Sequence, residues 1–316
     1  MKSNRSMVSL VGSYIEDRRQ LGFSMAIQAR RLLCFARFAD RLGHRGPITE
    51  ELAVRWARAT PRTNPMAAAD RLRVLRPFAQ YRRQFEPQTQ VPRSGLCGPE
   101  HRRLTPHIYS PQEIRALLAA ARELSPAGDL RATTCETVFG LLAATGLRIS
   151  EAMALRRCDV ELDRALITVR QTKFRKCRQL VLHATTAEAL RRYASFRDRH
   201  RPATQHDAFF LNDRGEPMNV RQVQYAFADL RTRLNWRARG GHPAPRIQDI
   251  RHTFICRRLL AWYQEGIDVG NAMLSLSTYV GHTQVTHTYW YITGIPELMS
   301  IAAQRFERFV QGDCHG

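Results

Sequence analysis

The feature that most constrains the fold is a long interruption in the pattern of apolar residues, from Glu86 to Tyr109. This stretch has neither a helical nor a strand period. Its residues that break regular structure are Pro87, Pro92, Gly95, Gly98, Pro99 and Pro106. Such a segment predicts a linker over 87–109, and a chain of 316 residues is long enough for a domain with its own core on each side.

The residues before the linker, 1–86, show only helical spacing. Thr49 opens a short helix, and a longer one follows from about Pro65 to Gln84. The inward positions of the longer helix are apolar, whereas five outward positions are arginines: Arg71, Arg73, Arg76, Arg82 and Arg83. These arginines form either a solvated face or a contact surface for a polyanion, and the charge of the whole chain favours contact.

The residues after the linker begin as helices and then change period. Ser110, Pro111 and Glu113 carry the signature of a helix N-terminus with a capping box. From Cys158 to His183, apolar and β-branched residues alternate between turns, which predicts three antiparallel strands. The predicted fold class is therefore mainly α with a small β-sheet. A helical N-terminal domain precedes an α+β domain over 110–296, and a tail helix is expected over 297–316.

The charge of the chain points to a polyanionic partner. The formal net charge is +21 and the sequence pI is about 10.8. Residues 1–105 carry 20 Lys and Arg against 8 Asp and Glu, and the remaining residues carry 29 against 20, so both domains share the excess. Double-stranded DNA gripped from two sides is the first candidate partner.

Other classes of partner and ligand are disfavoured by pattern. No apolar run approaches the roughly 18 residues of a membrane span, and the first residues lack the apolar stretch of a signal peptide. We therefore expect a cytoplasmic, nucleoid-associated protein with no membrane partner. The seven cysteines are scattered without metal-ligand spacing, so no metal site is expected.

Three local patterns place unusual polar residues on helices and turns. In the predicted helix from residue 247, Gln248 and Arg251 are three residues apart on one stripe, and His252 is expected to turn toward the core. Gly146 permits a left-handed turn, after which Ser150 is expected to cap a helix and leave Arg148 on the turn. Alone, such an arginine is more typical of a surface or a cap than of catalysis.

The third pattern is a rare lysine. Nearly every basic residue of the chain is Arg, yet Lys173 lies near the tip of the second predicted hairpin. It is either a solvated turn residue or a functional one, because an ammonium group, unlike a guanidinium, can give up a proton.

Five motifs in order resemble the tyrosine recombinases, also called phage-type integrases. They are ATGLRISE around Arg148, a hairpin lysine followed by Lys176 and Arg178, QDIRHTF around Arg251, VGH ending at His282, and Tyr291 nine positions later. The resemblance covers 110–292. It extends more loosely to 1–105 as the helical core-binding domain that clamps DNA, and the C-terminal end is similar to the transposon-encoded branch.

The resemblance implies a role for each matched residue. Arg148 and Arg251 would clamp the phosphate with His282 as a third ligand, Lys173 would donate a proton, and Tyr291 rather than Tyr289 would be the nucleophile. Glu151 would orient Arg148. Gln248 stands where the family usually has His, and an amide can donate to a phosphate oxygen but cannot act as a base. Lys176, Arg178 and the five outward arginines would contact DNA, and no cofactor is implied.

The implied activity is site-specific recombination through a covalent 3′-phosphotyrosyl DNA intermediate, in the service of a mobile element. The implied assembly is a homo-tetramer on DNA, alone or with related recombinases, in which the tail over 297–316 docks on a neighbour or folds back on its own domain. Two other interpretations stay open. One is a catalytically silent architectural partner, supported by Gln248, and the other is an enzyme similar to type IB topoisomerases.

Overall fold

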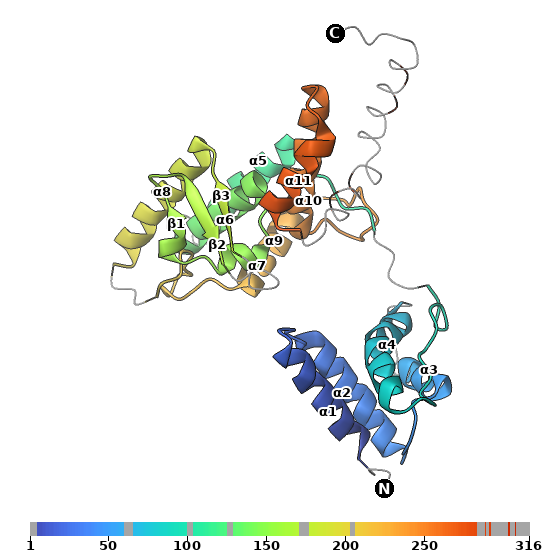
Figure 1. Cartoon of the computed structure of the whole chain (residues 1–316). Helices are drawn as coiled ribbons and strands as arrows, with labels where there is room; N and C mark the ends of the chain where they lie inside the picture. The colour runs from blue at the N-terminus through green and yellow to red at the C-terminus, as the bar shows by residue number, and fades with distance from the viewer. Residues whose placement is uncertain are drawn as a thin grey trace. The chain divides into compact units, whose positions relative to one another are not determined.

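The structure, a computed structural model, describes residues 5–59, 66–99, 104–124, 129–170, 177–202 and 206–282, together with the single positions Thr288, Tyr291, Ala303 and Glu307. The chain divides into two compact units, Met1–Arg103 and Leu104–Gly316 (Figure 1). The boundary falls inside the predicted linker.

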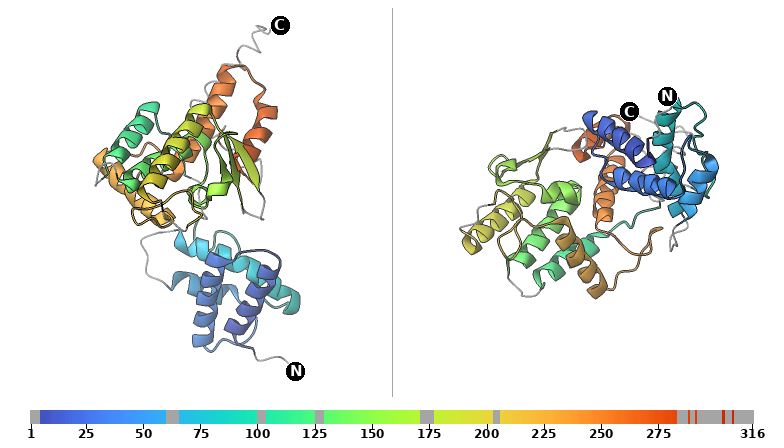
Figure 2. Two further views of the ribbon diagram at one scale, coloured as in Figure 1. Left: turned by 90° about the vertical axis from the view of Figure 1, so that its left-hand side faces the viewer. Right: turned by 90° about the horizontal axis from the view of Figure 1, so that it is seen from below.

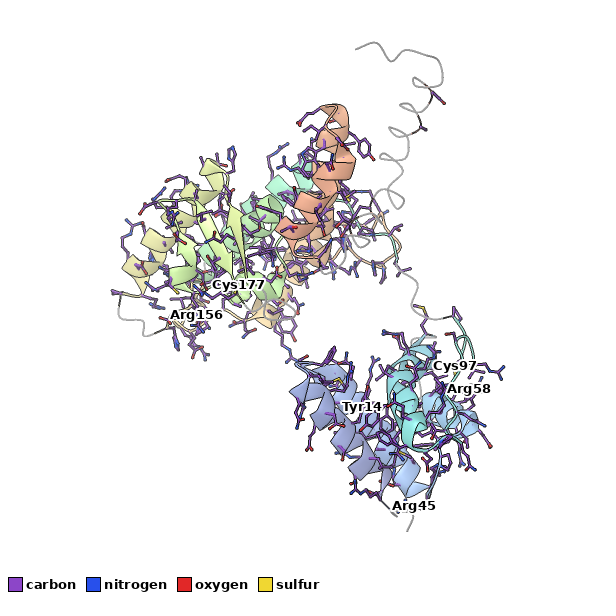
Figure 3. All side chains as sticks on the ribbon, viewed as in Figure 1. Tyr14, Arg45, Arg58, Cys97, Arg156 and Cys177 are labelled. Carbon is purple, nitrogen blue, oxygen red and sulfur yellow. The ribbon has the colours of Figure 1, made fainter. Side chains whose placement is uncertain are left out.

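The regular elements of the first unit, over its described residues, are four helices. Its helices are α1 (Met7–Gln20), α2 (Ala26–Arg41), α3 (Glu50–Arg58) and α4 (Ala67–Phe85). Thr49 caps α3 as predicted, since its hydroxyl accepts from the backbone N–H of Leu52 at 3.1 Å. Aromatic side chains fill the core; Tyr14, for example, lies among the helices in Figure 3, with its ring centroid 5.3 Å from that of Phe78.

Much of the predicted linker packs against this first unit. The backbone N–H of Gln90 donates to the carbonyl of Ile48 at 2.8 Å, and the guanidinium of Arg76 donates to the carbonyls of Pro92 and Arg93. The lack of an apolar period over these residues therefore reflects an irregular path along the surface of the unit.

The second unit is mainly helical and contains the small sheet (Figures 1 and 2). Its helices are α5 (Pro111–Arg122), α6 (Leu130–Thr145), α7 (Ile149–Met153), α8 (Ala184–His200), α9 (Val220–Arg233), α10 (Gln248–Gln264) and α11 (Val269–Val280), and a 3-10 turn, η1, spans Arg157–Asp159. The capping box of α5 is present, because Ser110 and Glu113 each accept from the other's backbone N–H. The predicted fold class is confirmed.

The sheet has the predicted antiparallel order β1–β2–β3. The strands are Val160–Glu161, Leu166–Val169 and Arg178–Val181. Val160 pairs with Ile167, and Leu166 pairs with Val181. Alternate residues of β2 are buried, as the period of two requires, and the end of β3 lies against α11. Lys173 and Lys176, expected in the β2–β3 hairpin, lie outside the described residues, and so does nearly all of the predicted tail helix.

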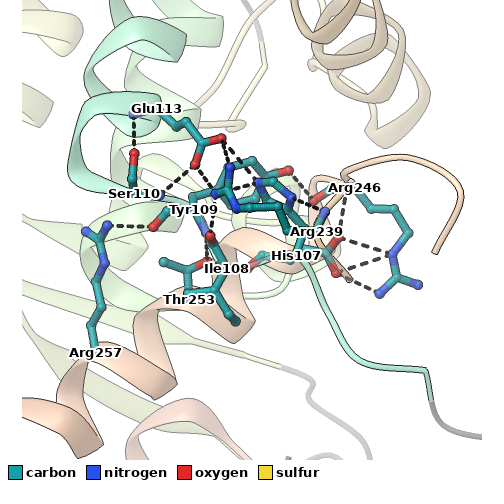
Figure 4. Close-up of polar contacts among 10 residues, drawn as sticks. His107, Ile108, Tyr109, Ser110, Glu113, Arg239, Arg246, Thr253 and Arg257 are labelled. Atoms are coloured by element: carbon teal, nitrogen blue, oxygen red, sulfur yellow. Dashed lines mark hydrogen bonds and ion pairs between the residues drawn. The ribbon is translucent and has the colours of Figure 1, made fainter. Parts of the chain in front are cut away.

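Residues 104–110 are bound tightly onto the outer side of α10 (Figure 4). The backbone N–H of Tyr109 donates to the hydroxyl of Thr253 at 2.9 Å, and Arg257 donates to the carbonyl of Tyr109 at 2.6 Å. Arg239 fastens the same segment by donating to the carbonyl of Ile108 at 2.8 Å, and it pairs with Glu113 of α5 at 2.5 Å. Thr253 and Arg257 are one turn apart on α10, so these contacts hold the helix on one face and leave the opposite face to the site described next.

Candidate active site

The turn between α6 and α7 places Arg148. Gly146 ends α6 with φ of +63°, and a Cβ atom there would lie 2.5 Å from the ring of Phe254. Both the backbone conformation and the close approach therefore require glycine. The next helix begins at Ile149, with Arg148 and not Ser150 at the N-cap position, so it starts two residues earlier than predicted. The carboxylate of Glu151 accepts from the backbone N–H of Arg148 at 3.0 Å and caps this end of the helix.

The carboxylate of Glu151 lies between two guanidinium groups. It accepts from Arg148 Nη1 at 2.8 Å and from Arg178 Nη2 at 2.8 Å, and its side chain is 9% exposed. Burial alone would raise the pKa of Glu151, but the hydrogen bond and charge of Arg178, followed by those of Arg148, outweigh burial and lower the pKa. Glu151 is therefore a fixed anion that sets the direction of the Arg148 fork.

Arg251 is a buried cation on the inner face of α10. Its Nη1 donates to the carbonyl of Gly146 at 2.7 Å, and its Nη2 donates to the carbonyl of Val280 at 2.7 Å. Burial, and then the charge of Arg148, lower the pKa of Arg251 to about 10, so the group remains protonated at neutral pH. Arg148 Nη2 also reaches the end of α11, where it donates to the carbonyl of Gly281 at 3.0 Å.

These contacts connect both Arg148 and Arg251 to two turns of the chain, the one at Gly146 and the one at Gly281. Arg148, Arg178 and Arg251 carry three positive charges against the one negative charge of Glu151. An excess of fixed positive charge around a partly exposed arginine side chain favours the binding of an anion such as a phosphate group.

Arg178, predicted to contact DNA, lies behind this fork. Its side chain is only 10% exposed, and its Nε donates to the carbonyl of Tyr279 at 2.9 Å. The turn at Gly281 has φ of +70°, and a Cβ atom there would lie 2.6 Å from Arg178 Nη1. Arg178 therefore has an internal role in supporting Glu151 and the end of α11, whatever it contacts on DNA.

Tyr291 is brought into the same site. Its side chain is 1% exposed, and its hydroxyl oxygen lies 2.5 Å from Nδ1 of His252. Its ring is nearly parallel to that of His282, with centroids 6.4 Å apart and 5° between the planes. His282 is held in turn by Thr288, whose hydroxyl lies 2.7 Å from Nδ1 of the imidazole. Tyr289, the alternative nucleophile, lies outside the described residues.

His252 is the site residue that our sequence reasoning misplaced. It was expected to satisfy the core, yet its imidazole is half-buried and meets the tyrosine hydroxyl. The signal was present in the spacing: His252 follows Gln248 by four residues, so both lie on one face of α10, a turn apart. Gln248 itself is half-buried at the first position of the helix.

Residues 108–295 match the phage integrase family. The chain belongs to this family of tyrosine recombinases. Its members are enzymes that cleave and rejoin DNA strands. The chain is 39% identical to a putative integrase/recombinase, y4rB, of Sinorhizobium fredii (strain NBRC 101917 / NGR234) over 304 residues, which cover 94% of this chain and 96% of the relative.

Solved structures share the fold of this family member. The Tn1549 transposon integrase in complex with transposon right end DNA has a TM-score of 0.67 at 18% identity, covering 97% of this chain and 100% of that one. The XerH site-specific recombinase bound to a palindromic difH substrate has a TM-score of 0.63 at 16% identity, covering 95% of this chain and 85% of that one.

The five arginines predicted to contact DNA differ in their surroundings within the first unit. Arg71 donates to the carbonyl of Trp56 at 2.9 Å, Arg82 pairs with Glu86 at 3.2 Å, and Arg76 holds the segment after α4. Arg73 is exposed but paired with Asp70, and Arg83 is exposed. The positions least committed to the unit's own structure are therefore Arg73 and Arg83.

In the described parts of the chain, no group of His, Cys, Asp and Glu side chains is placed to hold a metal ion. No described helix is both long enough and apolar enough to cross a bilayer.

Proposed function

We propose that this tyrosine recombinase is a site-specific DNA recombinase that acts through a covalent 3′-phosphotyrosyl intermediate on Tyr291. The observation that carries the proposal is the position of the Tyr291 hydroxyl. It lies in one site with the fixed guanidinium groups of Arg148 and Arg251 and with His282. A phenol that shares a site with a cluster of positive charge is suited to attack a phosphodiester.

Each residue has a distinct task in that reaction. Attack adds negative charge to the non-bridging oxygens, which the Arg148 and Arg251 forks stabilise with His282. Glu151 keeps Arg148 in place through its 2.8 Å hydrogen bond. Gln248 donates an amide hydrogen bond to the phosphate, and Lys173 protonates the leaving 5′-oxygen. The phosphotyrosyl bond conserves the energy of the phosphodiester, so a second 5′-hydroxyl can reverse the step.

The substrate is double-stranded DNA held by both units. The excess of basic residues on each side of residue 105 supports a two-sided grip, in which Arg71, Arg73, Arg76, Arg82 and Arg83 act with Lys176. Four chains would act together on two DNA sites, alone or with related recombinases, and the tail over 297–316 would couple neighbours. The likeness to an integrase named for a transposon supports service to a mobile element.

A second candidate function rests on Gln248. With an amide where the family usually has a histidine, the chain would bind and bridge DNA as an architectural partner of an active recombinase. A third candidate function is the cutting and resealing of DNA without strand exchange, as in type IB topoisomerases. It uses the same site chemistry, and an experiment separates it from the other two.

A nicked suicide substrate tests the proposal. The full-length chain first selects its duplex from a random library, and that duplex is then nicked near the cleavage point so that the freed 5′-hydroxyl strand diffuses away. Wild-type protein should become attached to DNA through its 3′ end. Tyr291→Phe should bind the duplex without attachment, whereas Tyr289→Phe should still attach.

The alternatives give different results in the same assay. Binding without any attachment by the wild-type chain would support the architectural partner. Attachment without exchange of strands between two intact sites would support the topoisomerase-like enzyme.

A further inference from the structure

We propose that His252 is the proton acceptor for Tyr291. Its Nδ1 takes the phenolic proton as the tyrosine oxygen attacks phosphorus. This inference rests on the proposed function, and it assigns a catalytic role to a residue outside the set that the family resemblance implied.

The geometry of the pair suits a direct proton transfer. The hydroxyl oxygen of Tyr291 and Nδ1 of His252 are 2.5 Å apart, and the ring centroids are 5.4 Å apart with 42° between the planes. The imidazole therefore meets the hydroxyl with a ring nitrogen and does not stack on the phenol. In a neutral imidazole one nitrogen is an acceptor, and a phenol is the donor that such an acceptor pairs with.

The burial of the tyrosine limits where its proton can go. With 1% of Tyr291 exposed, the phenol has little access to bulk water, so a neighbouring side chain is favoured as the acceptor of its proton. His282 lies parallel to the phenol ring, and its Nδ1 is 2.7 Å from the hydroxyl of Thr288. Of these two imidazoles, it is that of His252 for which the structure gives a ring nitrogen within hydrogen-bond distance of the reacting oxygen.

The side chain at position 248 explains why the proton acceptor is His252, one helical turn later. The first turn of α10 presents Gln248, whose amide cannot accept a proton. His252 stands four residues later on the same face of the same helix, and the backbone of Tyr109 holds α10 from another face through Thr253 and Arg257. This face of the helix therefore carries an imidazole at position 252, although position 248 carries an amide.

The step balances without a further reactant. The O–H bond of Tyr291 breaks and its proton forms an N–H bond at Nδ1 of His252, which becomes an imidazolium. The tyrosine oxygen bonds to phosphorus, and the bond from phosphorus to the 5′-oxygen breaks with its electron pair on that oxygen. Lys173 protonates the 5′-oxygen. In rejoining, the imidazolium returns the proton to the departing tyrosine.

The first test compares single-turnover rates of covalent attachment to the nicked duplex. His252→Gln should slow attachment by about 10²–10⁴, the usual contribution of a general base, while duplex binding and thermal melting stay close to wild type. His200→Gln is the control, because His200 is an exposed histidine at the end of α8, and its rate should not change.

Two further variants separate proton transfer from support of the structure. His252→Asn keeps an amide near the place of Nδ1, so it can hold the hydroxyl but cannot take its proton, and it should be as slow as His252→Gln. A fluorinated tyrosine at position 291 has a more acidic phenol that needs a base less. It should recover at least tenfold of the lost rate in the His252→Gln chain, with much less effect in wild type.

Each outcome decides a different question. Equal effects of fluorination in the two backgrounds, or wild-type rates in His252→Asn, would overturn the role of His252 as a base. If His252→Gln fails to fold, His252→Asn takes its place as the background in which the fluorinated tyrosine is tested. Absence of attachment by the wild-type chain would instead remove the proposed function itself.

Discussion

Replacing Glu151 by glutamine should strongly destabilise the second unit. The two carboxylate oxygens accept four hydrogen bonds, two from Arg148 and two from Arg178, at 2.8–3.2 Å. An amide keeps the shape but removes the charge, and it turns one acceptor into a donor that faces other donors. The site would then hold three guanidinium groups with no anion among these four side chains.

The size of the effect follows from burial. Breaking a buried ion pair by removing one partner costs about 3–5 kcal/mol. The side chain of Arg178 is 10% exposed, whereas that of Arg148 is 36% exposed, so water compensates Arg148 in part. We therefore expect the lower end, about 3 kcal/mol, which corresponds to a fall in melting temperature of roughly 6–12 °C for a unit of this size.

The assay is thermal unfolding of the full-length chain followed by circular dichroism. Glu161→Gln is the matched control, because Glu161 pairs with Arg164 at 3.3 Å with side chains 36% and 73% exposed. Its loss should change the free energy of unfolding by at most about 1 kcal/mol. If Glu151→Gln melts with the control at neutral pH, the reasoning is refuted.

Acid titration gives a second arm to this prediction. The folded-state pKa of Glu151 is lowered, so its stabilisation is present above the unfolded-state pKa and is lost as the pH falls through the folded-state value. The gap in stability between wild type and Glu151→Gln should therefore close in acid. A gap that persists unchanged below the folded-state pKa would contradict the charge-based explanation.

Two further outcomes are expected at the active site and a third in DNA binding. Gly281→Ala should lower the melting temperature and slow cleavage, because the added Cβ atom would lie 2.6 Å from Arg178 Nη1. Gly266→Ala is the control: Gly266 has a similar φ of +76° but open space around it, so this variant measures the backbone strain alone. Gln248→His should raise the rate of attachment to the nicked duplex, and most in the His252→Gln background; no gain in either would mean that the pocket is built around the amide. DNA affinity should fall steeply with salt and should be weaker for residues 104–316 alone, as measured by fluorescence anisotropy, whereas equal affinity would exclude the two-sided grip.

The sequence predicted the features that depend on near neighbours along the chain. The capping box at Ser110, the left-handed turn at Gly146 and the three strands each arise from residues within a few positions of one another. The same local signals placed Arg148 at the turn after Gly146 and Arg251 on the helix that begins near residue 247.

The parts that could not be predicted depend on contacts across the chain. Arg178 meets Glu151 across 27 positions, and Arg148 meets Gly281 across 133, so neither spacing carries a local signal. The start of α7 was misplaced because Glu151 caps it from the third position, in competition with Ser150. His252 was misplaced for a different reason: it was compared with Arg251, its direct neighbour, when Gln248 was the residue that shares its face.

The most direct test of the account is to identify the residue that carries DNA. The covalent adduct formed on the nicked duplex is digested with trypsin and nuclease, and fragmentation in a mass spectrometer locates the remaining nucleotide. We expect a 3′-phosphate ester on the oxygen of Tyr291. A nucleotide on Tyr289, on any other side chain, or on none would contradict it.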